Sequence, residues 1–531
     1  MGPEMSPFVT LSDYLERSAE RVPDRPCVID PSGETVIYRQ FDEKANRVAN
    51  WLVSIGVQAG DRVGICLPKG ADSLACVFGI LKAGAVYVPV DYTAPTERNR
   101  YIFSNCRVKA ACIDARCVAI FDAPGQGSHL PDALLIFGDA QASSSANSPI
   151  WVSASALNSQ PGTRPDVPPR GPNDLAYILY TSGSTGPHKG VRLSRDNGTS
   201  YVTWTTEVFN PTENDRFTSH APFHFDLSIL DIYVPLKHGA ALYIISEELG
   251  KNAAALGQFI ADNRITCWYS VPSILSLMTQ FGKLDQHDAS SLRIVNFAGE
   301  VFPVKYLRRL RELWPHPAFY NLYGPTETNV CTWYQIPDTI PPDREEPYPI
   351  GKVCSHCKDL VIGDNGKPVP RGEEGLLYIA GKPVLMGYWA DPERTENAFL
   401  THDGERYYNT GDVVRPDENG DYVFLGRKDR MVKRHGYRIE LGEIEAALYK
   451  HAGVAEAATI AVAQGGDAVT IQAVLSAKPD AKLGVIAMKQ HCAGSLPAYM
   501  IPDTFVFMDK LPATSTGKID YQSLLRAARG G

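Results

Sequence analysis

The sequence lacks an apolar run long enough to cross a bilayer. Its longest such run, Cys76–Val90, is interrupted by Lys82, whereas a membrane-spanning helix needs about 20 consecutive apolar residues. The opening MGPEMSPF has no basic n-region and no apolar core, so we expect no signal peptide. A basic excess is also missing, because the net charge is −8. These absences argue against nucleic acid and membranes as partners and favour a cytoplasmic protein.

Cysteine is sparse and scattered, with eleven residues in a chain of 531. Scattered thiols are typical of proteins from a reducing compartment. Cys354 and Cys357 form one C-x-x-C motif, but no second pair stands at zinc-ribbon spacing and no thioredoxin-like pattern surrounds it. We therefore expect buried thiols here, not a metal or redox site.

Helical and strand patterns alternate through most of the chain. Residues 41–56 have the spacing of an amphipathic helix that ends at Gly56. Residues 61–68 and 85–91 read as buried strands on either side of a helix at 71–84. This β–α–β order predicts an α/β fold with a mostly parallel sheet covered by helices on both faces.

The pattern changes after Arg415. A hairpin turn, a helix and several alternating segments follow, which indicates a compact α+β unit of about 100 residues. We place the boundary near Lys428, with a large domain at 1–427 and a small domain at 428–531.

The stretch YILYTSGSTGPHKGV, residues 177–191, carries the first chemical signal. A strand runs into a turn rich in glycine and hydroxyl groups, and a lysine follows. Such a turn directs backbone N–H groups and hydroxyls at one point, which suits phosphate. The spacing differs from the P-loop of NTPases, and by itself the stretch is also compatible with a surface turn.

Three further stretches complete a pattern: NLYGPTETN at 321–329, YNTGDVVR at 408–415 and LPATSTGKID at 511–520. With these four motifs in this order, the chain resembles the adenylate-forming superfamily of acyl-CoA synthetases, luciferases and adenylation domains of nonribosomal peptide synthesis. The resemblance implies a large N-terminal α/β domain and a small α+β domain joined by a hinge. It also implies two steps: a carboxylate attacks the α-phosphate of ATP and releases pyrophosphate, and a thiol then takes the acyl group.

The resemblance assigns the nucleotide site residue by residue. Thr326, Glu327 and Lys518 are expected to be catalytic, with Glu327 as the Mg²⁺ ligand, a hard carboxylate for a hard cation. Tyr323 should stack on adenine and Asp412 should accept the ribose hydroxyls. The complete expected ATP site is Thr181, Ser182, Gly183, Ser184, Thr185, Gly186, Lys189, Gly299, Glu300, Asn321, Leu322, Tyr323, Gly324, Thr326, Asp412, Arg427 and Lys518.

One position of the phosphate loop departs from the family. Most relatives read T-G-x-P-K-G, whereas this chain reads T-G-Pro187-His188-Lys189-G. The family pattern therefore does not fix the conformation of the loop near Lys189. The simplest interpretation of His188 is a solvated loop residue.

The resemblance also implies a hinge at Asp429, about which the small domain rotates to exchange the two faces it presents to the site. Lys433 and Gly436 would then belong to the face used in thiol transfer. The alternative for Lys433 is a solvated surface charge.

Asp226 indicates which acid is activated. Amino-acid enzymes of this family carry an aspartate at this place to pair with the substrate ammonium; a helix N-cap is the alternative role. Asn296 stands where leucine is expected, and a buried amide needs a polar partner. The complete expected substrate pocket is Phe225, Asp226, Leu227, Leu230, Tyr269, Asn296, Ala298, Leu322, Val330, Cys331 and Lys518.

This pocket suits a compact cyclic or aliphatic amino acid and is similar to that of free-standing L-prolyl-AMP ligases. We therefore expect activation of L-proline and transfer to a peptidyl carrier protein supplied in trans, because the chain ends 13 residues after Lys518. The alternatives are a modified proline or another small amino acid, an acyl-CoA ligase, a carrier-free or luciferase-type enzyme, and an inactive scaffolding relative.

Overall fold

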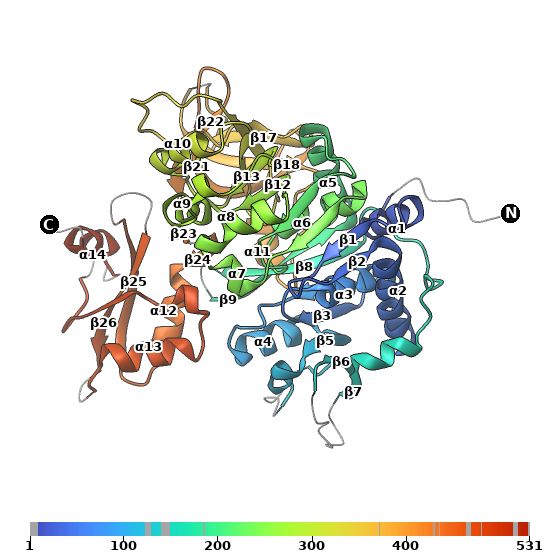
Figure 1. Cartoon of the computed structure of the whole chain (residues 1–531). Coiled ribbons are helices and arrows are strands. Elements are labelled where there is room, and N and C mark those ends of the chain that lie inside the picture. Colours follow the sequence, from blue (N-terminus) through green and yellow to red (C-terminus); the bar gives the residue numbers. More distant parts are fainter. Residues whose placement is uncertain are drawn as a thin grey trace.

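The structure, a computed structural model, describes residues 9–122, 129–139, 149–183, 186–370, 372–427, 431–434, 436–463, 469–478, 481–512 and 519–528. Figure 1 shows a large domain built on mixed α/β layers and a smaller domain packed against one side of it. The α/β class and the two-domain division expected from the sequence are confirmed. The boundary at 427/428 stays a prediction, because residues 428–430, including Asp429, lie outside the described residues.

The first large sheet has eight strands. In spatial order they are β19 (Gly387–Tyr388), β9 (Gly186–Ser194), β8 (Leu175–Gly183), β4 (Val86–Pro89), β3 (Arg62–Cys66), β5 (Ala110–Asp114), β6 (Ala133–Phe137) and β7 (Ile150–Ser153). The strands from β8 to β7 are parallel, whereas β9 runs antiparallel to both of its neighbours. The predicted strands at 61–68 and 85–91 are confirmed as β3 and β4.

The second large sheet has nine strands. In spatial order they are β16 (Lys352–Val353), β15 (Thr332–Ile336), β14 (Ala318–Tyr323), β13 (Ile294–Ala298), β12 (Cys267–Ser270), β10 (Arg216–Ser219), β11 (Ala241–Ile244), β1 (Pro26–Ile29) and β2 (Thr35–Ile37). The central strands are parallel, so their carboxyl ends share one edge of the sheet. Open α/β sheets bind ligands at that edge.

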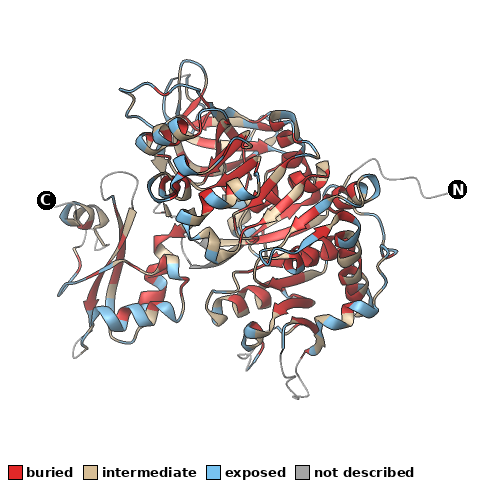
Figure 2. Ribbon diagram, in the orientation of Figure 1, coloured by how far each residue is buried: buried red, intermediate tan, exposed pale blue. Residues whose placement is uncertain are grey.

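Helices fill the space between and outside these sheets. Those that share the main core with both sheets are α1 (Leu11–Arg21), α2 (Tyr38–Ser54), α3 (Ala71–Lys82), α5 (Arg195–Phe209) and α6 (Ser228–His238). The other helices of the large domain are α4 (Thr96–Cys106), α7 (Glu247–Gly250), α8 (Ala253–Asp262), α9 (Pro272–Phe281), α10 (Val304–Leu313), α11 (Pro392–Asn397) and the 3-10 turns η1 (Ala115–Ile120), η2 (Ala154–Ser159) and η3 (Leu284–Gln286). Figure 2 shows the buried residues concentrated in the sheets and on the inner helix faces. The predicted helices at 41–56 and 71–84 are confirmed as α2 and α3.

A third, five-stranded antiparallel sheet closes the large domain. Its strands are β17 (Cys357–Ile362), β18 (Gly375–Gly381), β21 (Glu405–Pro416), β20 (Phe399–His402) and β22 (Tyr422–Arg427). The hairpin from β21 to β22 pairs Asp412 with Arg427, two residues of the expected ATP site.

The small domain has its own core, as the predicted α+β unit requires. Its elements are β23 (Met431–Arg434), β24 (Tyr437–Glu440), α12 (Leu441–Tyr449), β25 (Val454–Ala463), β26 (Val469–Ala477), α13 (Val485–Ala493), η4 (Ala498–Met500), β27 (Thr504–Phe507) and α14 (Tyr521–Ala528). The antiparallel pair of β23 and β24, here named the docking hairpin, faces the large domain (Figure 1).

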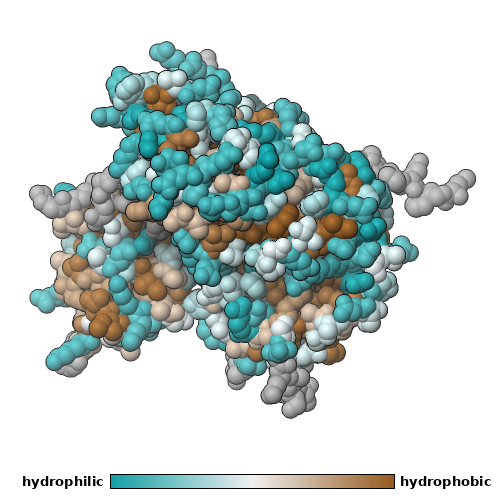
Figure 3. All heavy atoms as spheres, in the orientation of Figure 1, coloured by the Kyte–Doolittle hydropathy of each residue, from teal (hydrophilic) through white to brown (hydrophobic). Residues whose placement is uncertain are grey.

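The surface is mostly hydrophilic on the face drawn in Figure 3, with a hydrophobic area on the small domain over α13. Val485 and Ile486 are the exposed apolar side chains at the start of that helix. Within the described ranges, no helix has both the length and the apolar character that crossing a bilayer requires.

Candidate active site

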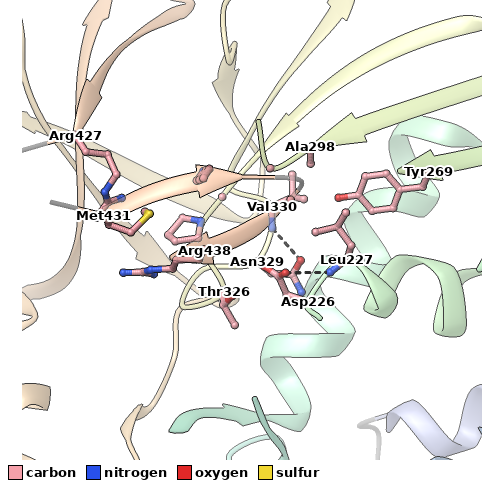
Figure 4. Close-up of a pocket in the computed structure, with 15 residues that line it drawn as sticks. Asp226, Leu227, Tyr269, Ala298, Thr326, Asn329, Val330, Arg427, Met431 and Arg438 are labelled. Carbon is pink, nitrogen blue, oxygen red and sulfur yellow. Dashed lines mark hydrogen bonds between the residues drawn. The ribbon is translucent and has the colours of Figure 1, made fainter. Parts of the chain in front are cut away.

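A cavity lies where the carboxyl ends of β12 and β13, the loop after β14 and the docking hairpin meet. In Figure 4, Arg427, Met431 and Arg438 approach from the side of the small domain, and Leu227 and Tyr269 lie on the opposite side. The lining residues are Asp226, Leu227, Tyr269, Ala298, Gly299, Gly324, Pro325, Thr326, Asn329, Val330, Arg427, Met431, Lys433, Gly436 and Arg438. Both domains therefore contribute walls to this cavity.

Asp226 is the carboxylate at the large-domain end of the cavity. It precedes α6, and one of its oxygens accepts the N–H of Leu227 at 3.1 Å. Leu227 is the residue that caps the helix, so Asp226 is not the N-cap. Desolvation by the surrounding protein raises the pKa of Asp226 to about 6. The charge of Lys433 and a hydrogen bond from Thr326 offset this desolvation only in part, and Asp226 forms no direct ion pair among the described residues.

Glu327 has the opposite electrostatic setting. Its side chain is completely buried, with Lys189 Nζ 3.1 Å from Oε1 and Arg438 Nη1 3.0 Å from Oε2. The Tyr388 hydroxyl also donates to Oε1 at 2.9 Å. Desolvation alone would raise the pKa of Glu327, but Arg438 and Lys189 outweigh it and hold that pKa well below its ordinary value. The large domain supplies one of these cations and the small domain the other.

The predicted adenosine residues form a second polar cluster. The Tyr323 hydroxyl donates to one oxygen of Asp412, and Arg427 Nη1 donates to the other at 2.6 Å. Lys433 Nζ lies 5.3 Å from the centre of the Tyr323 ring, a cation–π distance. The interpretation of Lys433 as a solvated surface charge is therefore wrong. Asn321 donates from Nδ2 to the carbonyl of Pro349 at 2.8 Å.

Gly436 docks the hairpin onto the large domain. Its N–H donates to Glu300 Oε1 at 2.7 Å, and Glu300 Oε2 accepts from the N–H of Ser273 at 3.1 Å. Gly436 has a φ of +78°, and a Cβ there would lie 2.3 Å from Cγ1 of Val271. Only glycine permits this close approach without displacing the Val271 side chain.

The turn after β14 has a similar requirement. A Cβ on Gly324 would lie 1.5 Å from the carbonyl oxygen of Asn329. This tight turn brings Thr326 and Val330 to the cavity from opposite ends of the loop.

Some residues of the predicted substrate pocket line the cavity, and the others are buried behind them. Asp226, Leu227, Tyr269, Ala298 and Val330 line the cavity. Leu230, Asn296, Leu322 and Cys331 are buried, and Phe225 packs edge-on against Tyr437 of the docking hairpin with ring centres 5.0 Å apart.

Asn296 shares a face of its sheet with the cavity-lining residues. It is paired in register with Tyr269 on the neighbouring strand and stands two residues before Ala298 on the same strand. Its Oδ1 atom is buried and has no hydrogen-bond partner among the described residues.

Several predicted site residues lie wholly or partly outside the described part of the chain. Ser184, Thr185 and Lys518 lie outside the described residues, and only the backbone of Ser182, Gly183 and Gly186 is placed, in the hairpin of β8 and β9. The Thr181 hydroxyl is buried without a partner among the described residues.

One further sequence interpretation needs correction, and two contacting residues were missed. His188 is not a solvated loop residue; its side chain is 11% exposed and lies between Arg98 and Glu443. Arg438 and Tyr388 contact Glu327 but were not predicted as site residues. Nothing in their local sequence pattern indicated which carboxylate they would reach.

Two family models match this sequence: the AMP-binding enzyme at residues 15–389 and the AMP-binding enzyme C-terminal domain at 443–518. The chain belongs to the AMP-binding enzyme family. Two curated relatives are named L-proline–[L-prolyl-carrier protein] ligase. The one from Streptomyces coelicolor is 38% identical over 94% of this chain and 93% of its own, and the one from Pseudomonas fluorescens is 38% identical over 98% and 99%.

Solved structures of AMP-binding enzymes agree in fold. The Vibrio cholerae adenylation domain AlmE, in complex with glycyl-adenosine-5′-phosphate, has a TM-score of 0.84 at 22% identity over the whole of both chains. The anthranilate CoA ligase AuaEII, in complex with anthranoyl-AMP, has a TM-score of 0.73 at 24% identity and covers 99% and 98% of the two chains. At these identities the likeness establishes the adenylate-forming fold alone.

Proposed function

We propose that the chain is a ligase that uses ATP to activate L-proline as prolyl-AMP, releases pyrophosphate, and transfers the prolyl group to the phosphopantetheine thiol of a separate carrier protein. The observation that carries the proposal is Asp226, a desolvated carboxylate that forms no ion pair among the described residues although Lys433 lines the same cavity. Leu227, Tyr269 and Val330 supply apolar and aromatic lining beside it. Two full-length relatives with this named activity support it.

The amino-acid end of the cavity selects the substrate. The secondary ammonium of proline would replace the missing counter-ion of Asp226, and the apolar lining would contact the ring. A fatty or aryl acid brings no cation and would leave this carboxylate unpaired. Asp226 therefore argues against the acyl-CoA ligase alternative.

The opposite end of the cavity would bind the phosphates of ATP and stabilise their negative charge. Lys189, Thr326 and Lys518 would surround the α-phosphate and the leaving pyrophosphate, where negative charge develops. Glu327 offers the hard carboxylate oxygens that Mg²⁺ prefers, although Lys189 and Arg438 occupy both oxygens in this arrangement. Glu327 would hold the ion once Arg438 withdraws with the small domain, and the ion would neutralise phosphate charge when bound. No group of three or more His, Cys, Asp or Glu side chains that could hold a metal occurs in the described part of the chain, so phosphate oxygens would complete its ligands.

The arrangement of the small domain fits the second step. Lys433, Gly436 and Arg438 line the cavity. By contrast, Leu511 and Ile519, which flank the segment of Lys518, pack against Ile460 and Val462 of the small domain itself. A rotation at Asp429 would bring Lys518 to the site for the first step and the docking hairpin for the second.

The test is amino-acid-dependent ATP–pyrophosphate exchange with proline, hydroxyprolines, pipecolate, alanine and valine, followed by loading of a phosphopantetheinylated carrier or coenzyme A. We expect the highest kcat/KM with proline and transfer to the carrier only. No exchange with any cyclic imino acid would refute the proline assignment, and a fatty or aryl acid as best substrate would refute amino-acid activation.

A hydroxylated or otherwise polar-substituted proline is the second candidate. Asn296 favours it, because a buried amide oxygen without a partner costs free energy that a donor on the substrate would recover. Preference for a hydroxyproline over proline in the same exchange assay would decide for this candidate.

A further inference from the structure

Three charged or polar side chains meet where the two domains touch. Arg98 comes from α4, His188 from β9 and Glu443 from the first turn of α12. Arg98 Nη1 donates to His188 Nε2 at 2.9 Å and lies 3.4 Å from Glu443 Oε1. His188 Nδ1 lies 3.1 Å from the same oxygen. All three side chains are about nine-tenths buried: Arg98 and Glu443 are 9% exposed and His188 11%.

The cluster places opposite charges on the two sides of the domain boundary. Desolvation and the nearby Arg98 lower the pKa of His188 to about 2, so the imidazole is neutral. Arginine only donates, so His188 Nε2 accepts and its proton is on Nδ1, which lies 3.1 Å from Glu443 Oε1 without making a hydrogen bond to it. Arg98, a residue of the other domain, is therefore a cationic partner of Glu443. Separating such a buried pair is costly unless both groups reach water.

The cluster is separate from the phosphate residues although it adjoins them in sequence. His188 and Lys189 are consecutive on a strand, so their side chains point to opposite faces. Lys189 reaches Glu327, whereas His188 reaches Arg98 and Glu443. The replacement that distinguishes this phosphate loop thus adds a contact to the small domain and leaves the phosphate-facing lysine in place.

We propose that Arg98, His188 and Glu443 form an interdomain latch: positioning residues that hold the docking hairpin at the cavity for thiol transfer and separate when the small domain turns for adenylation. That the docking hairpin occupies the cavity during thiol transfer rests on the proposed function. The latch itself rests on the contacts between domains.

The direct test measures the distance between the domains in the full-length protein without ligands. Spin labels attached at Lys305→Cys in the large domain and Lys489→Cys in the small domain report the interdomain distance. Both positions are exposed, and the natural cysteines are all buried. We expect one dominant distance for the parent protein. Arg98→Glu and Glu443→Arg should each shift or broaden it, and the double charge exchange should restore it, because neutral His188 can reverse its donor and acceptor nitrogens.

The matched control is Arg116→Glu, a charge reversal at a side chain that is 68% exposed. It should leave the distance distribution unchanged. Unchanged distributions in both single latch variants, or no restoration in the charge exchange, would overturn the latch.

The kinetic test separates the two steps. Each single variant should slow transfer from preformed aminoacyl-AMP to the carrier about tenfold or more, while ATP–pyrophosphate exchange stays within about twofold. Equal losses in both steps would indicate a general structural defect and overturn the positioning role. If no amino acid supports exchange, the proposed function fails, yet the distance measurement still decides the latch.

Discussion

The two ends of the cavity treat a buried carboxylate in opposite ways. Glu327, at the phosphate end, lies between Lys189 and Arg438, and its pKa is held low. Asp226, at the amino-acid end, has no described ion pair, and desolvation raises its pKa to about 6. Under the proposed function, the carboxylate at the end that would bind phosphates is neutralised by the protein's own cations, whereas the carboxylate that would bind the substrate ammonium has no direct ion pair among the described residues.

The difference also separates the roles of the domains. Arg438 of the docking hairpin reaches Glu327 across the domain boundary, so the proposed rotation of the small domain would change the cations around this carboxylate. The setting of Asp226 is built mainly from the large domain, by the start of α6 and the ends of β12 and β13. Substrate selection can therefore persist while the phosphate end is rearranged between steps.

The largest effect is expected at Lys518, the cation that we propose reaches the phosphate end of the cavity during adenylation. Lys518→Ala should lower amino-acid-dependent ATP–pyrophosphate exchange by about 10²–10³, since a charge stabiliser of the transition state is lost. Amino-acid binding, followed calorimetrically, should stay largely intact. Lys510→Ala, at an exposed lysine of the same domain, should exchange normally. Exchange at a near-parental rate in Lys518→Ala would contradict the assignment.

At the amino-acid end of the cavity, Asp226→Ala should raise the KM for proline by two to three orders of magnitude. The reason is that removing one partner of a desolvated ion pair costs about 3–5 kcal/mol. Steady-state exchange kinetics measure this, with ATP binding as the internal control. A proline KM within a few-fold of the parent would remove Asp226 from the ammonium site.

Asp226→Asn should also stabilise the ligand-free protein. The pKa of Asp226 rises from 3.8 to about 6 on folding, so the folded protein retains a proton that the unfolded chain releases. Stability is therefore lost as the pH rises from about 4 to about 6. We expect Asn to recover about 2–3 kcal/mol in urea unfolding at about pH 8, and much less at about pH 4.5.

The exposed Asp285→Asn serves as the control, with no gain at either pH. A destabilised Asp226→Asn protein at about pH 8 would show that an unseen partner holds the carboxylate.

The smallest effect tests the layer behind the cavity. Asn296→Leu should lower kcat/KM for 4-hydroxyproline relative to proline by up to about tenfold, a discrimination expected for one substrate contact. Exchange assays on both acids measure the ratio. An unchanged ratio would mean that Asn296 reads no polar group on the substrate.

Much of the site could be predicted because its parts are local. Gly324 is required by a turn that closes within a few residues, and Asp226 stands at a fixed place before α6. The short continuous apolar runs that form the buried strands β3 and β4 are likewise read within short windows. The interpretation of His188 failed for the converse reason, since its partners come from distant segments.

The sequence by itself determined the strand and helix order, the motif loops, and the kinds of charged groups available to phosphate and ammonium, because these depend on neighbours in the chain. Only the tertiary structure decided which charges meet. Arg438 reaches Glu327 across 111 residues of sequence, and Arg98 reaches Glu443 across 345. No local propensity encodes such pairs; they form because two independently packed domains touch, and burial then makes each unpaired charge costly.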